Sequence, residues 1–416
     1  MKNLSNYVLL LFIIACILSC KKGDGPINNG NTISVKDQLK SPEIVQASNK
    51  FGFNLFKAIE KNAPDKNIFI SPFSALEALS MTYNGANGLT KTEMAGVLGF
   101  TGYSDDEVNK YNQSLTNALL KADNKVKFEV ANSIWYDKYF HVLKSFLDVN
   151  RIYYNAEVSS LDFQSSDALI TINNWVNSKT NGKIPTILDQ LPANAVMYLI
   201  NAIYFYGTWK YQFDKSKTIE ADFIKEDGTT VQQQQMNIEE DINYFGNDDF
   251  QMAGLPYGNG TFNFIMILPG EGKNIEDILT GLNSSKWDSL IYSMQKQKVN
   301  VKMPKFKFEF RDSMNTPLKS IGMTSAFNPG SADFSRIDSL KDFFISRVLQ
   351  KTYINLNEEG TEAAAVTVVE ISKTTAFVPL VFNANRPFIY AITEQSTGAV
   401  LFIGKMMDPT EVKVEL

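Results

Sequence analysis

Residues 357–369 read NEEGTEAAAVTVV, and the composition of this segment is the strongest structural signal in the chain. The run VTVV at 366–369 consists of β-branched residues, which are poor helix formers. Gly360 and the three alanines at 363–365 offer a strand little surface to pack. The segment therefore suits neither a helix nor a strand well, which indicates a segment that occupies two different conformational states.

The overall composition is that of an ordinary globular protein, with 416 residues, 44% hydrophobic and 20% charged. This length is sufficient for one large domain or two smaller ones. The formal net charge of −5 provides no basic surface for a polyanion. We therefore expect no nucleic-acid partner.

The first 20 residues carry a targeting signal. After Lys2, the apolar run VLLLFIIACIL at 8–18 is short for a membrane span. It ends at ILSC, residues 17–20, which resembles the box of bacterial lipoproteins in which the cysteine becomes lipidated. Residues 1–19 are interpreted as a lipoprotein signal peptide, with Cys20 as the lipid anchor of a bacterial cell-envelope protein, in the outer membrane or at the cell surface. An ordinary cleaved signal peptide or a short N-terminal anchor is the alternative.

The residues after Cys20 are polar and rich in glycine and asparagine, as in KKGDGPINNGNTIS at 21–34. This composition predicts a flexible tether over 20–40, followed by a single domain over 41–416. Removal of the signal peptide would leave Cys20 as the only cysteine, which excludes an internal disulfide. The stability of the domain must then come from packing.

A single histidine, His141, restricts the enzymatic chemistry open to the chain. Nucleophilic sites of the Ser-His-Asp or Cys-His type would need it, and zinc sites with several His or Cys ligands cannot be assembled. His141 lies in YFHVLKSFLD, which is expected to form an amphipathic helix with the histidine at its surface or in its packing. The usual nucleophile-elbow and phosphate-binding motifs do not occur. We therefore expect no enzyme, no metal and no cofactor.

Hydrophobic periodicity predicts helices early in the chain and long strands later. A helix is expected over 44–62, a second after Ser71-Pro72, and a third over 91–100 that is closed by Gly99. This order indicates an α+β fold in one large domain. Strand-forming composition occurs at 126–137, 196–207, 262–270, 299–310 and 352–357, and in two strands around a turn at 396–398.

Seven blocks of the chain, in a fixed order, carry a resemblance to a known family. From about residue 44 to its C-terminus the chain resembles the serpins. The matching blocks include NIFISPFSALEALSMTYNGANGLTKTEM at 67–94 and VLQKTYINLNEEGTEAAA at 348–365. The other five lie at 201–218, 255–270, 303–310, 318–337 and 382–409.

The resemblance implies a serpin fold of three β-sheets with eight or nine helices and an exposed reactive-centre loop at about 358–381. It also implies a suicide-type inhibitor of serine proteases, in which the cleaved loop inserts into the central sheet and traps the acyl-enzyme as a covalent 1:1 complex. Papain-like cysteine proteases are a further implied target class, and the inhibitor is expected to be a monomer. The alternative is a non-inhibitory serpin-fold binding module with a static loop.

The hinge of this loop has the small residues that insertion requires. Side chains of an inserting strand alternate, which places the small residues at 361, 363, 365 and 367 toward the core and Glu362 outward. Gly360 provides the backbone freedom that a hinge needs. This composition favours inhibition over a static loop. The hinge comprises Glu358, Glu359, Gly360, Thr361, Glu362, Ala363, Ala364 and Ala365.

Five further positions follow from the resemblance alone. Trp209 matches the tryptophan below the point where insertion begins, called the breach. Ser71, Ser74 and Asn201 match a polar cluster at the midpoint of the sheet, called the shutter. Gln350 stands where many members have histidine, which removes a titratable group and argues against a pH-controlled opening.

The scissile bond is assigned by counting along the loop. Counting from Glu358, as in typical inhibitory members, places it between Thr374 and Thr375, and Thr374 would suit the shallow pocket of an elastase-like protease. The neighbouring bond between Lys373 and Thr374 would suit a trypsin-like protease. Phe377 would attract chymotrypsin-like enzymes but would lengthen the inserted segment. We expect both of the first two bonds to be used.

Overall fold

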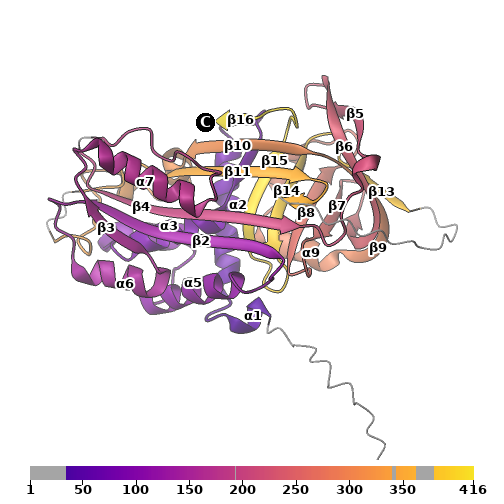
Figure 1. The fold of residues 1–416 in the computed structure, drawn as a ribbon. Coiled ribbons are helices and arrows are strands. Elements are labelled where there is room, and N and C mark those ends of the chain that lie inside the picture. Colours follow the sequence, from indigo (N-terminus) through magenta and orange to yellow (C-terminus); the bar gives the residue numbers. More distant parts are fainter. Residues whose placement is uncertain (1–33, 193, 340–342, 362–378) are drawn as a thin grey trace, which may run out of the picture. The chain divides into compact units, whose positions relative to one another are not determined.

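The computed structural model describes residues 34–192, 194–339, 343–361 and 379–416. Residues Ser34–Leu416 form one compact unit (Figure 1). The unit begins before the boundary expected at residue 41, because Val35 of helix α1 (Val35–Gln38) and Leu39 are buried. The predicted tether is therefore wrong for residues 34–40, which belong to the domain.

Capping signals close to each terminus explain where several helices begin and end. Ser71 is the N-cap of α3, and its hydroxyl accepts a hydrogen bond from the backbone N–H of Ser74. Ser104 and Glu107 form a reciprocal capping box on α5. Gly99 ends α4 in the left-handed conformation, as predicted. The described ranges contain ten α-helices: α1, α2 (Ile44–Glu60), α3 (Pro72–Tyr83), α4 (Gly88–Leu98), α5 (Asp105–Leu119), α6 (Lys144–Tyr154), α7 (Ser166–Lys179), α8 (Ile275–Gly281), α9 (Ser284–Ser293) and α10 (Asn315–Ser320).

His141 does not lie in a helix, contrary to the prediction. The backbone at Leu143 is extended, so α6 begins only at Lys144. The side chain of His141 is 71% exposed, and its Nδ1 atom lies 3.6 Å from Oδ1 of Asp338. The histidine is a surface residue, which was one of the two positions expected for it, at the surface or in the packing.

Within the described residues, the first sheet has nine strands and forms much of the core. Its hydrogen bonding is continuous because β6 is 17 residues long and pairs with β5, β7 and β9. Every residue of β8, β14 and β15 is buried, which is typical of strands covered on both faces. The strands lie in the order β1 (Ile68–Ile70), β15 (Val400–Met406), β14 (Phe388–Glu394), β8 (Phe262–Pro269), β7 (Phe250–Pro256), β6 (Thr230–Gly246), β9 (Gln295–Pro304) and β13 (Leu380–Asn383), with β5 (Ile219–Ile224) beside β6.

The second sheet has seven strands in the described part of the chain, and its two longest lie side by side in Figure 1. The single strand expected over 299–310 is two strands, because the chain leaves the first sheet after Pro304 and enters the second at Phe306. The order is β16 (Lys413–Glu415), β10 (Phe306–Ser313), β11 (Leu349–Asn357), β12 (Gly360–Thr361), β4 (Met197–Thr208), β2 (Val126–Asp137) and β3 (Glu157–Leu161).

The α+β class expected from the sequence is confirmed, and the described residues contain ten α-helices where eight or nine were expected. Among the described residues, hydrogen bonding connects the strands into two sheets instead of three, since β6 is shared by neighbours on both of its edges. Helix α3 packs against β4 of one sheet and β15 of the other. All of its residues except Ala78 are buried, so its polar side chains must find partners inside the protein.

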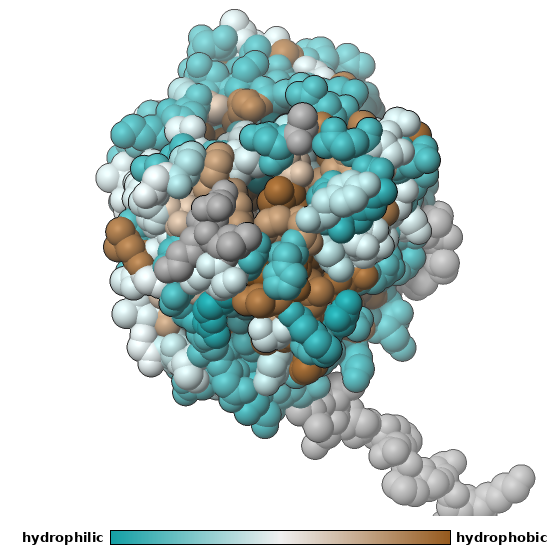
Figure 2. All heavy atoms as spheres, turned by 90° about the vertical axis from the view of Figure 1, so that its left-hand side faces the viewer, coloured by the Kyte–Doolittle hydropathy of each residue, from teal (hydrophilic) through white to brown (hydrophobic). Residues whose placement is uncertain are grey.

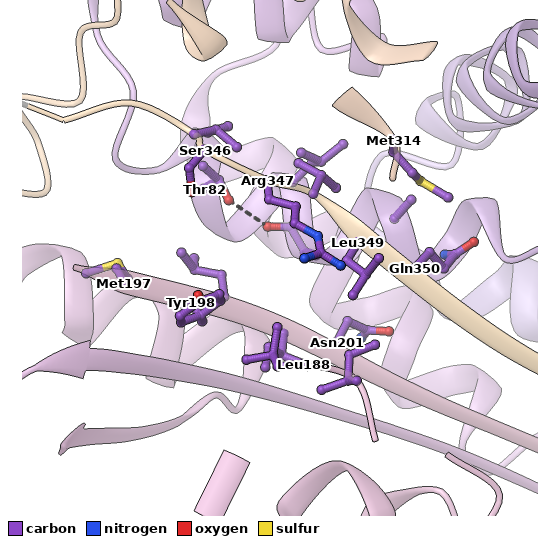
Figure 3. Close-up of a pocket in the computed structure, with 18 of the residues that line it drawn as sticks. Thr82, Leu188, Met197, Tyr198, Asn201, Met314, Ser346, Arg347, Leu349 and Gln350 are labelled. Carbon is purple, nitrogen blue, oxygen red and sulfur yellow. Dashed lines mark hydrogen bonds between the residues drawn. The ribbon is translucent and has the colours of Figure 1, made fainter. Parts of the chain in front are cut away.

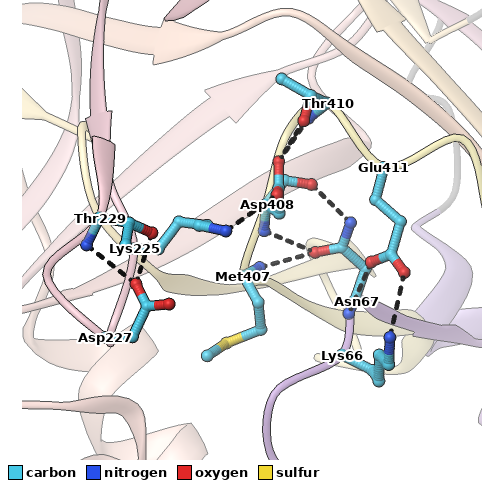
Figure 4. Close-up of polar contacts among 9 residues, drawn as sticks. All are labelled: Lys66, Asn67, Lys225, Asp227, Thr229, Met407, Asp408, Thr410 and Glu411. Carbon is cyan, nitrogen blue, oxygen red and sulfur yellow. Dashed lines mark hydrogen bonds and ion pairs between the residues drawn. The ribbon is translucent and has the colours of Figure 1, made fainter. Parts of the chain in front are cut away.

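A buried asparagine fastens the end of β15 to the start of β1 (Figure 4). The side-chain amide of Asn67 donates to the carbonyl oxygen of Asp408 at 2.6 Å. Its Oδ1 atom accepts from the backbone N–H groups of Met407 at 2.7 Å and Asp408 at 3.0 Å. Lys225 adds an ion pair to Asp408 at 3.6 Å. These contacts fix the C-terminal segment on the core without a disulfide.

Candidate functional site

The short strand β12 lies between β4 and β11 in the second sheet, and among the described residues it joins these two strands at one end only. There, Thr361 of β12 pairs with Gly207 and Leu356, while Gly360 pairs with Thr208 and Asn357. Among the described residues, no strand pairs with the remaining facing edges at 197–206 and 349–355. We call the space between these two edges the gap.

A cavity of about 330 Å³ occupies the gap (Figure 3). Its lining is largely apolar, from α3, β4, β11 and the segment before β11, and it includes the polar side chains of Ser74, Asn201 and Gln350. Figure 2 views the molecule from the side where β4 and β11 begin. Apolar side chains gather at the centre of this face, and hydrophilic ones surround them. The gap is thus an apolar space, bounded by two unpaired strand edges, that could accept another strand.

Gly360 has a conformation and a position that suit no other residue. Its φ is +148°, in the region that L side chains rarely adopt. A Cβ atom added there would lie 2.0 Å from the carbonyl oxygen of Gly207. The glycine predicted as the hinge therefore allows β12 to enter the sheet beside β4.

Two stacked aromatic rings lie beside β12. The rings of Trp209 and Tyr257 stack with 4.5 Å between their centroids. The indole Nε1 of Trp209 donates to the carbonyl oxygen of Asn357 at 2.9 Å. The backbone N–H of Trp209 donates to the carbonyl oxygen of Glu359, also at 2.9 Å. The Tyr257 hydroxyl lies 2.6 Å from Oγ1 of the buried Thr361, and burial raises the pKa of Tyr257. Thr361 thus faces the core, as its alternation predicted, and Trp209 lies at the entrance of the gap.

Glu358 and Glu359 are buried and paired with lysines that the sequence did not single out. Glu358 forms an ion pair with Lys305 at 3.0 Å and accepts from the Thr218 hydroxyl at 2.9 Å. Burial by itself would raise the pKa of Glu358, but hydrogen bonds from its own backbone N–H, Lys305 and Thr218 hold that pKa below its usual value. Lys215 pairs with Glu359 at 2.5 Å, which raises the pKa of Lys215.

The predicted bounds of the exposed loop, 358–381, are therefore too wide. Residues 358–361 are buried at or in the second sheet, since they form β12 and the turn before it. At the other end, Leu380 and Val381 are in β13, which pairs with β9. Both ends of the predicted loop belong to strands because each finds hydrogen-bonding partners on an available sheet edge.

The side chains predicted for the shutter divide into two groups. In the first, Ser71 and Gln350 exchange two hydrogen bonds: the backbone N–H of Ser71 donates to Oε1 of Gln350 at 3.0 Å, and Nε2 of Gln350 donates to the carbonyl oxygen of Ser71 at 2.8 Å. The Ser71 hydroxyl donates to the carbonyl oxygen of Leu401 at 2.7 Å and accepts from the backbone of Ser74 at 3.1 Å. Gln350 thereby fastens β11 to the N-terminus of α3.

Asn201 belongs to the second group, on the other side of the gap. Its Nδ2 donates to Oδ1 of Asn132 on β2 at 2.8 Å. The Nδ2 of Asn132 in turn donates to Oε2 of Glu77, on α3, at 3.2 Å. Burial raises the pKa of Glu77 to about 8. Sequence reasoning missed Glu77, although a glutamate within the apolar helix sequence FSALEALSM was a detectable signal.

A second carboxyl group lies next to Gln350. Asp312 of β10 is the register partner of Gln350, and burial raises the pKa of Asp312 to about 6. The region beside Gln350 therefore contains a titratable group, although the histidine of many members is absent. Glu77 is linked to one edge of the gap and Asp312 lies beside the other.

Several predicted site residues lie outside the described residues. They are Cys20, Glu362, Ala363, Ala364, Ala365, Lys373, Thr374 and Thr375. Within the described ranges, no helix is long and apolar enough to cross a membrane, and no group of three or more His, Cys, Asp or Glu side chains is arranged to hold a metal ion.

Comparison with known sequences identifies relatives over most of the chain. The family model described as serpin (serine protease inhibitor) matches residues 46–409. An uncharacterized serpin-like protein of Thermococcus kodakarensis is 32% identical, over 97% of this chain and 98% of that protein. The human leukocyte elastase inhibitor is also 32% identical, over 88% of this chain and 100% of that protein.

Solved structures share the fold. The thermophilic serpin tengpin in its native state has a TM-score of 0.80 and 36% identity, covering 88% of this chain and 94% of that one. Human thyroxine-binding globulin in complex with thyroxine has a TM-score of 0.81 and 30% identity, covering 89% of this chain and 99% of that one. Because the family model, the relatives and the solved structures agree over the same region, the chain belongs to the serpin family.

Proposed function

We propose that this serpin is a suicide-type inhibitor of serine proteases, whose cleaved reactive loop inserts into the gap between β4 and β11. The observation that carries the proposal is β12, in which Gly360 and Thr361 pair with both edges at the entrance of the gap. A strand that continued from Thr361 in the same direction would run between the two unpaired edges. The family's general role as protease inhibitors supports the same function.

Insertion would release free energy from two sources. A new central strand would form ladder hydrogen bonds with both β4 and β11, and it would bury the apolar lining of the gap. About 15 inserted residues at roughly 3.3 Å each would carry a tethered protease on the order of 50 Å. A protease displaced and compressed in this way would lose its oxyanion-hole geometry and could not complete deacylation. The inhibitor supplies no catalytic group in this mechanism.

The proposed targets follow from the bait residues of the loop. Cleavage between Thr374 and Thr375 would suit elastase-like proteases, and cleavage between Lys373 and Thr374 would suit trypsin-like ones. The similarity to human leukocyte elastase inhibitor is in keeping with the first class. Papain-like cysteine proteases remain part of the proposal because they too form an acyl-enzyme with a nucleophilic side chain.

The second candidate function is a non-inhibitory binding module. The observation that favours it is the similarity to human thyroxine-binding globulin, which was solved with its small ligand bound. Against it stand the gap and the small residues of the hinge, which a static loop would not need. A binding module would be cleaved without forming a covalent complex.

We also propose that Cys20 is lipidated and anchors the inhibitor in a bacterial cell envelope. The support is the ILSC sequence at the end of the apolar run. Labelling of expressing cells with a radioactive fatty acid should mark the wild-type protein and leave Cys20→Ala unlabelled. Equal labelling of both would contradict the assignment.

The inhibitory mechanism is tested with a soluble form, residues 34–416, mixed with a trypsin-like and an elastase-like protease. We expect a covalent band on denaturing gels and a released C-terminal peptide that begins at Thr374 or Thr375, which mass spectrometry would identify. Cleavage without a covalent band would contradict inhibition and favour the binding module. A single cleavage position for both proteases would contradict the use of two registers.

A matched pair of hinge variants separates insertion from cleavage. Ala363→Arg places a large charged side chain at an inward position, whereas Ala364→Arg places it at an outward one. We expect Ala363→Arg to be cleaved without trapping the protease, and Ala364→Arg to trap it nearly as well as the wild type. Equal trapping by both variants would contradict insertion in the proposed register.

A further inference from the structure

We propose that Glu77 is a positioning residue that controls the opening of the gap through Asn132 and Asn201, and that ionisation of its carboxyl group favours opening. The inference rests on the proposed loop insertion. It concerns a side chain of α3 that hydrogen-bonds to Asn132 and Thr116.

Glu77 is a buried carboxyl group without a compensating cation. Its side chain is almost fully buried, with 1% of the residue exposed. It accepts one hydrogen bond from Nδ2 of Asn132 at 3.2 Å and one from the Thr116 hydroxyl at 3.3 Å. Among the described residues, it forms no ion pair with Lys, Arg or His. Burial without a counter-charge favours the neutral acid, so the group titrates near pH 8.

The titratable groups that face Glu77 do not change this conclusion. Tyr111 of α5 and Tyr154 of α6 interact with its charge, and burial raises the pKa of both phenols, so they stay neutral over the same pH range. Lys179 and Glu157 line a cavity of about 180 Å³ that Glu77 also lines, but they pair with each other at 2.5 Å. The negative charge of an ionised Glu77 would therefore remain uncompensated.

Two side chains in series, Asn132 and Asn201, connect Glu77 to one edge of the gap. Asn132 and Asn201 are directly opposite each other on β2 and β4, and they are joined by a 2.8 Å hydrogen bond. Asn201 lines the gap, and its Oδ1 atom is buried without a partner among the described residues. The amide nitrogen of Asn132 donates both to Glu77 at 3.2 Å and to the carbonyl oxygen of Tyr154 at 2.9 Å. The side chains of Asn201 and Asn132 therefore fasten β4 to α3 through a titratable group.

The opposite edge is fastened to the same helix by groups that do not titrate. Gln350 of β11 exchanges two hydrogen bonds with the backbone of Ser71, which is the N-cap of α3. Insertion of a strand must increase the distance between β4 and β11, so at least one of them must move relative to α3. Of these two links among the described residues, the one through Glu77 changes its charge with pH, whereas Asp312 lies beside β11 and is not part of either link.

Ionisation should therefore promote movement of β2 and β4 away from α3. The closed arrangement favours the neutral acid, whereas an open arrangement would admit water to the carboxylate and return its pKa toward the ordinary value of 4.5. By linkage, opening becomes more favourable as the pH rises toward the pKa of the closed form and stays constant above it. Each unit of pH within this window changes the equilibrium by up to about tenfold.

The test measures strand insertion directly, without a protease. A synthetic peptide with the sequence of residues 361–374 is mixed with the soluble protein between pH 6 and pH 9, and the rate of incorporation is followed on native gels. For the wild type we expect the rate to rise on the order of tenfold between pH 6.5 and pH 8 and then to level off. For Glu77→Gln, which keeps the shape but cannot ionise, we expect a flat profile.

Two further variants make the test specific. Asn201→Ala keeps the contact between Glu77 and Asn132 but removes the side-chain hydrogen bond from Asn201 to Asn132. The pH profile of peptide incorporation should therefore also be flat for this variant. Asn201→Ala decides the question if Glu77→Gln does not fold. Asp288→Asn is the matched control. Asp288 is a half-buried carboxyl group of α9, and burial raises its pKa. Its side chain contacts Gln46 on α2, away from both strands of the gap. Its profile should follow that of the wild type.

The outcomes separate this inference from the proposed function. A wild-type pH dependence that persists in Glu77→Gln, or that persists in Asn201→Ala, contradicts the role of Glu77. Loss of the dependence in Asp288→Asn contradicts it equally, because the effect would then be a general one. Absence of incorporation at every pH, together with absence of a covalent protease complex, contradicts loop insertion itself.

Discussion

The rings of Trp209 and Tyr257 stack with an angle of 11° between their planes, and both lie at the entrance to the gap. The Trp209 indole binds the last residue of β11, Asn357, while the Tyr257 hydroxyl binds Thr361 in β12. The stacked pair therefore connects the strand that ends at the entrance with the one that begins there. This arrangement stabilises β12, from which the proposed insertion would continue.

Tyr257→Phe should keep the stacked ring and lose only the contact to Thr361. We expect the free energy of unfolding to fall by about 1–2 kcal/mol, because a buried hydroxyl loses its partner. The double variant Tyr257→Phe with Thr361→Val should lose less than the sum of the two single variants. Urea denaturation of the four proteins measures this coupling, and strictly additive effects would contradict a direct hydrogen bond.

Gly360→Ala should expel β12 from the sheet or destabilise the protein. Its Cβ atom would lie 2.0 Å from the Gly207 carbonyl oxygen at a φ of +148°, so we expect a loss of more than about 2 kcal/mol, by thermal or urea denaturation. Gly96→Ala is the matched control: it lies within α4, and nothing is within 4 Å of its added Cβ. That change should stabilise the protein by about 0.5–1 kcal/mol. A neutral Gly360→Ala would contradict the observed geometry.

Lys305→Met should leave the buried Glu358 carboxylate without its cation. We expect a loss of about 1–2 kcal/mol at pH 7, because Glu358 is buried but the Lys305 side chain is itself 45% exposed and partly screened by solvent. Because the pKa of Glu358 is lowered in the folded protein, its stabilising contribution is present above the ordinary value of 4.5 and disappears as the pH falls through the lowered one. The difference between the wild type and Lys305→Met should therefore shrink toward acid pH.

The control for this ion pair is Lys298→Met. Lys298 and Glu239 are 3.9 Å apart, and both side chains are more than a third exposed. An exposed pair contributes little, so the change should stay within about 0.5 kcal/mol at every pH. Equal losses in the two variants would show that burial of Glu358 is unimportant.

Asn67→Ala should release the C-terminal segment from the core. Asn67 is fully buried, and three hydrogen bonds join its side chain to the backbone of Met407 and Asp408. We expect a loss of about 3 kcal/mol, because two backbone N–H groups and one carbonyl lose their partner. Asn62→Ala removes an exposed hydrogen bond to Ala58 and should change stability by less than about 0.5 kcal/mol. A comparable loss in both variants would contradict the anchoring role.

Short-range patterns in the sequence were sufficient to predict much of the fold. The strand expected at 126–137 is β2 with the same bounds, and the helix expected at 44–62 is α2, ending two residues earlier. The helix after Ser71 begins at Pro72 because the cap that defines its start is local. Signals of this kind depend on residues within a few positions of each other, so they could be read without knowing which distant residues pack against them.

The environment of the candidate site depends on residues far apart in the chain, and it could not be read from the sequence. Glu358 was expected in an exposed hinge but is buried, because Lys305 and Thr218 reach it from other strands. Asn201 was grouped with Ser71, yet it bonds to Asn132, and the buried Glu77 beyond it was not predicted at all. Burial, pairing and pKa are properties of the assembled core, since they depend on which distant side chains exclude water from a group, and only the packed structure supplies those neighbours.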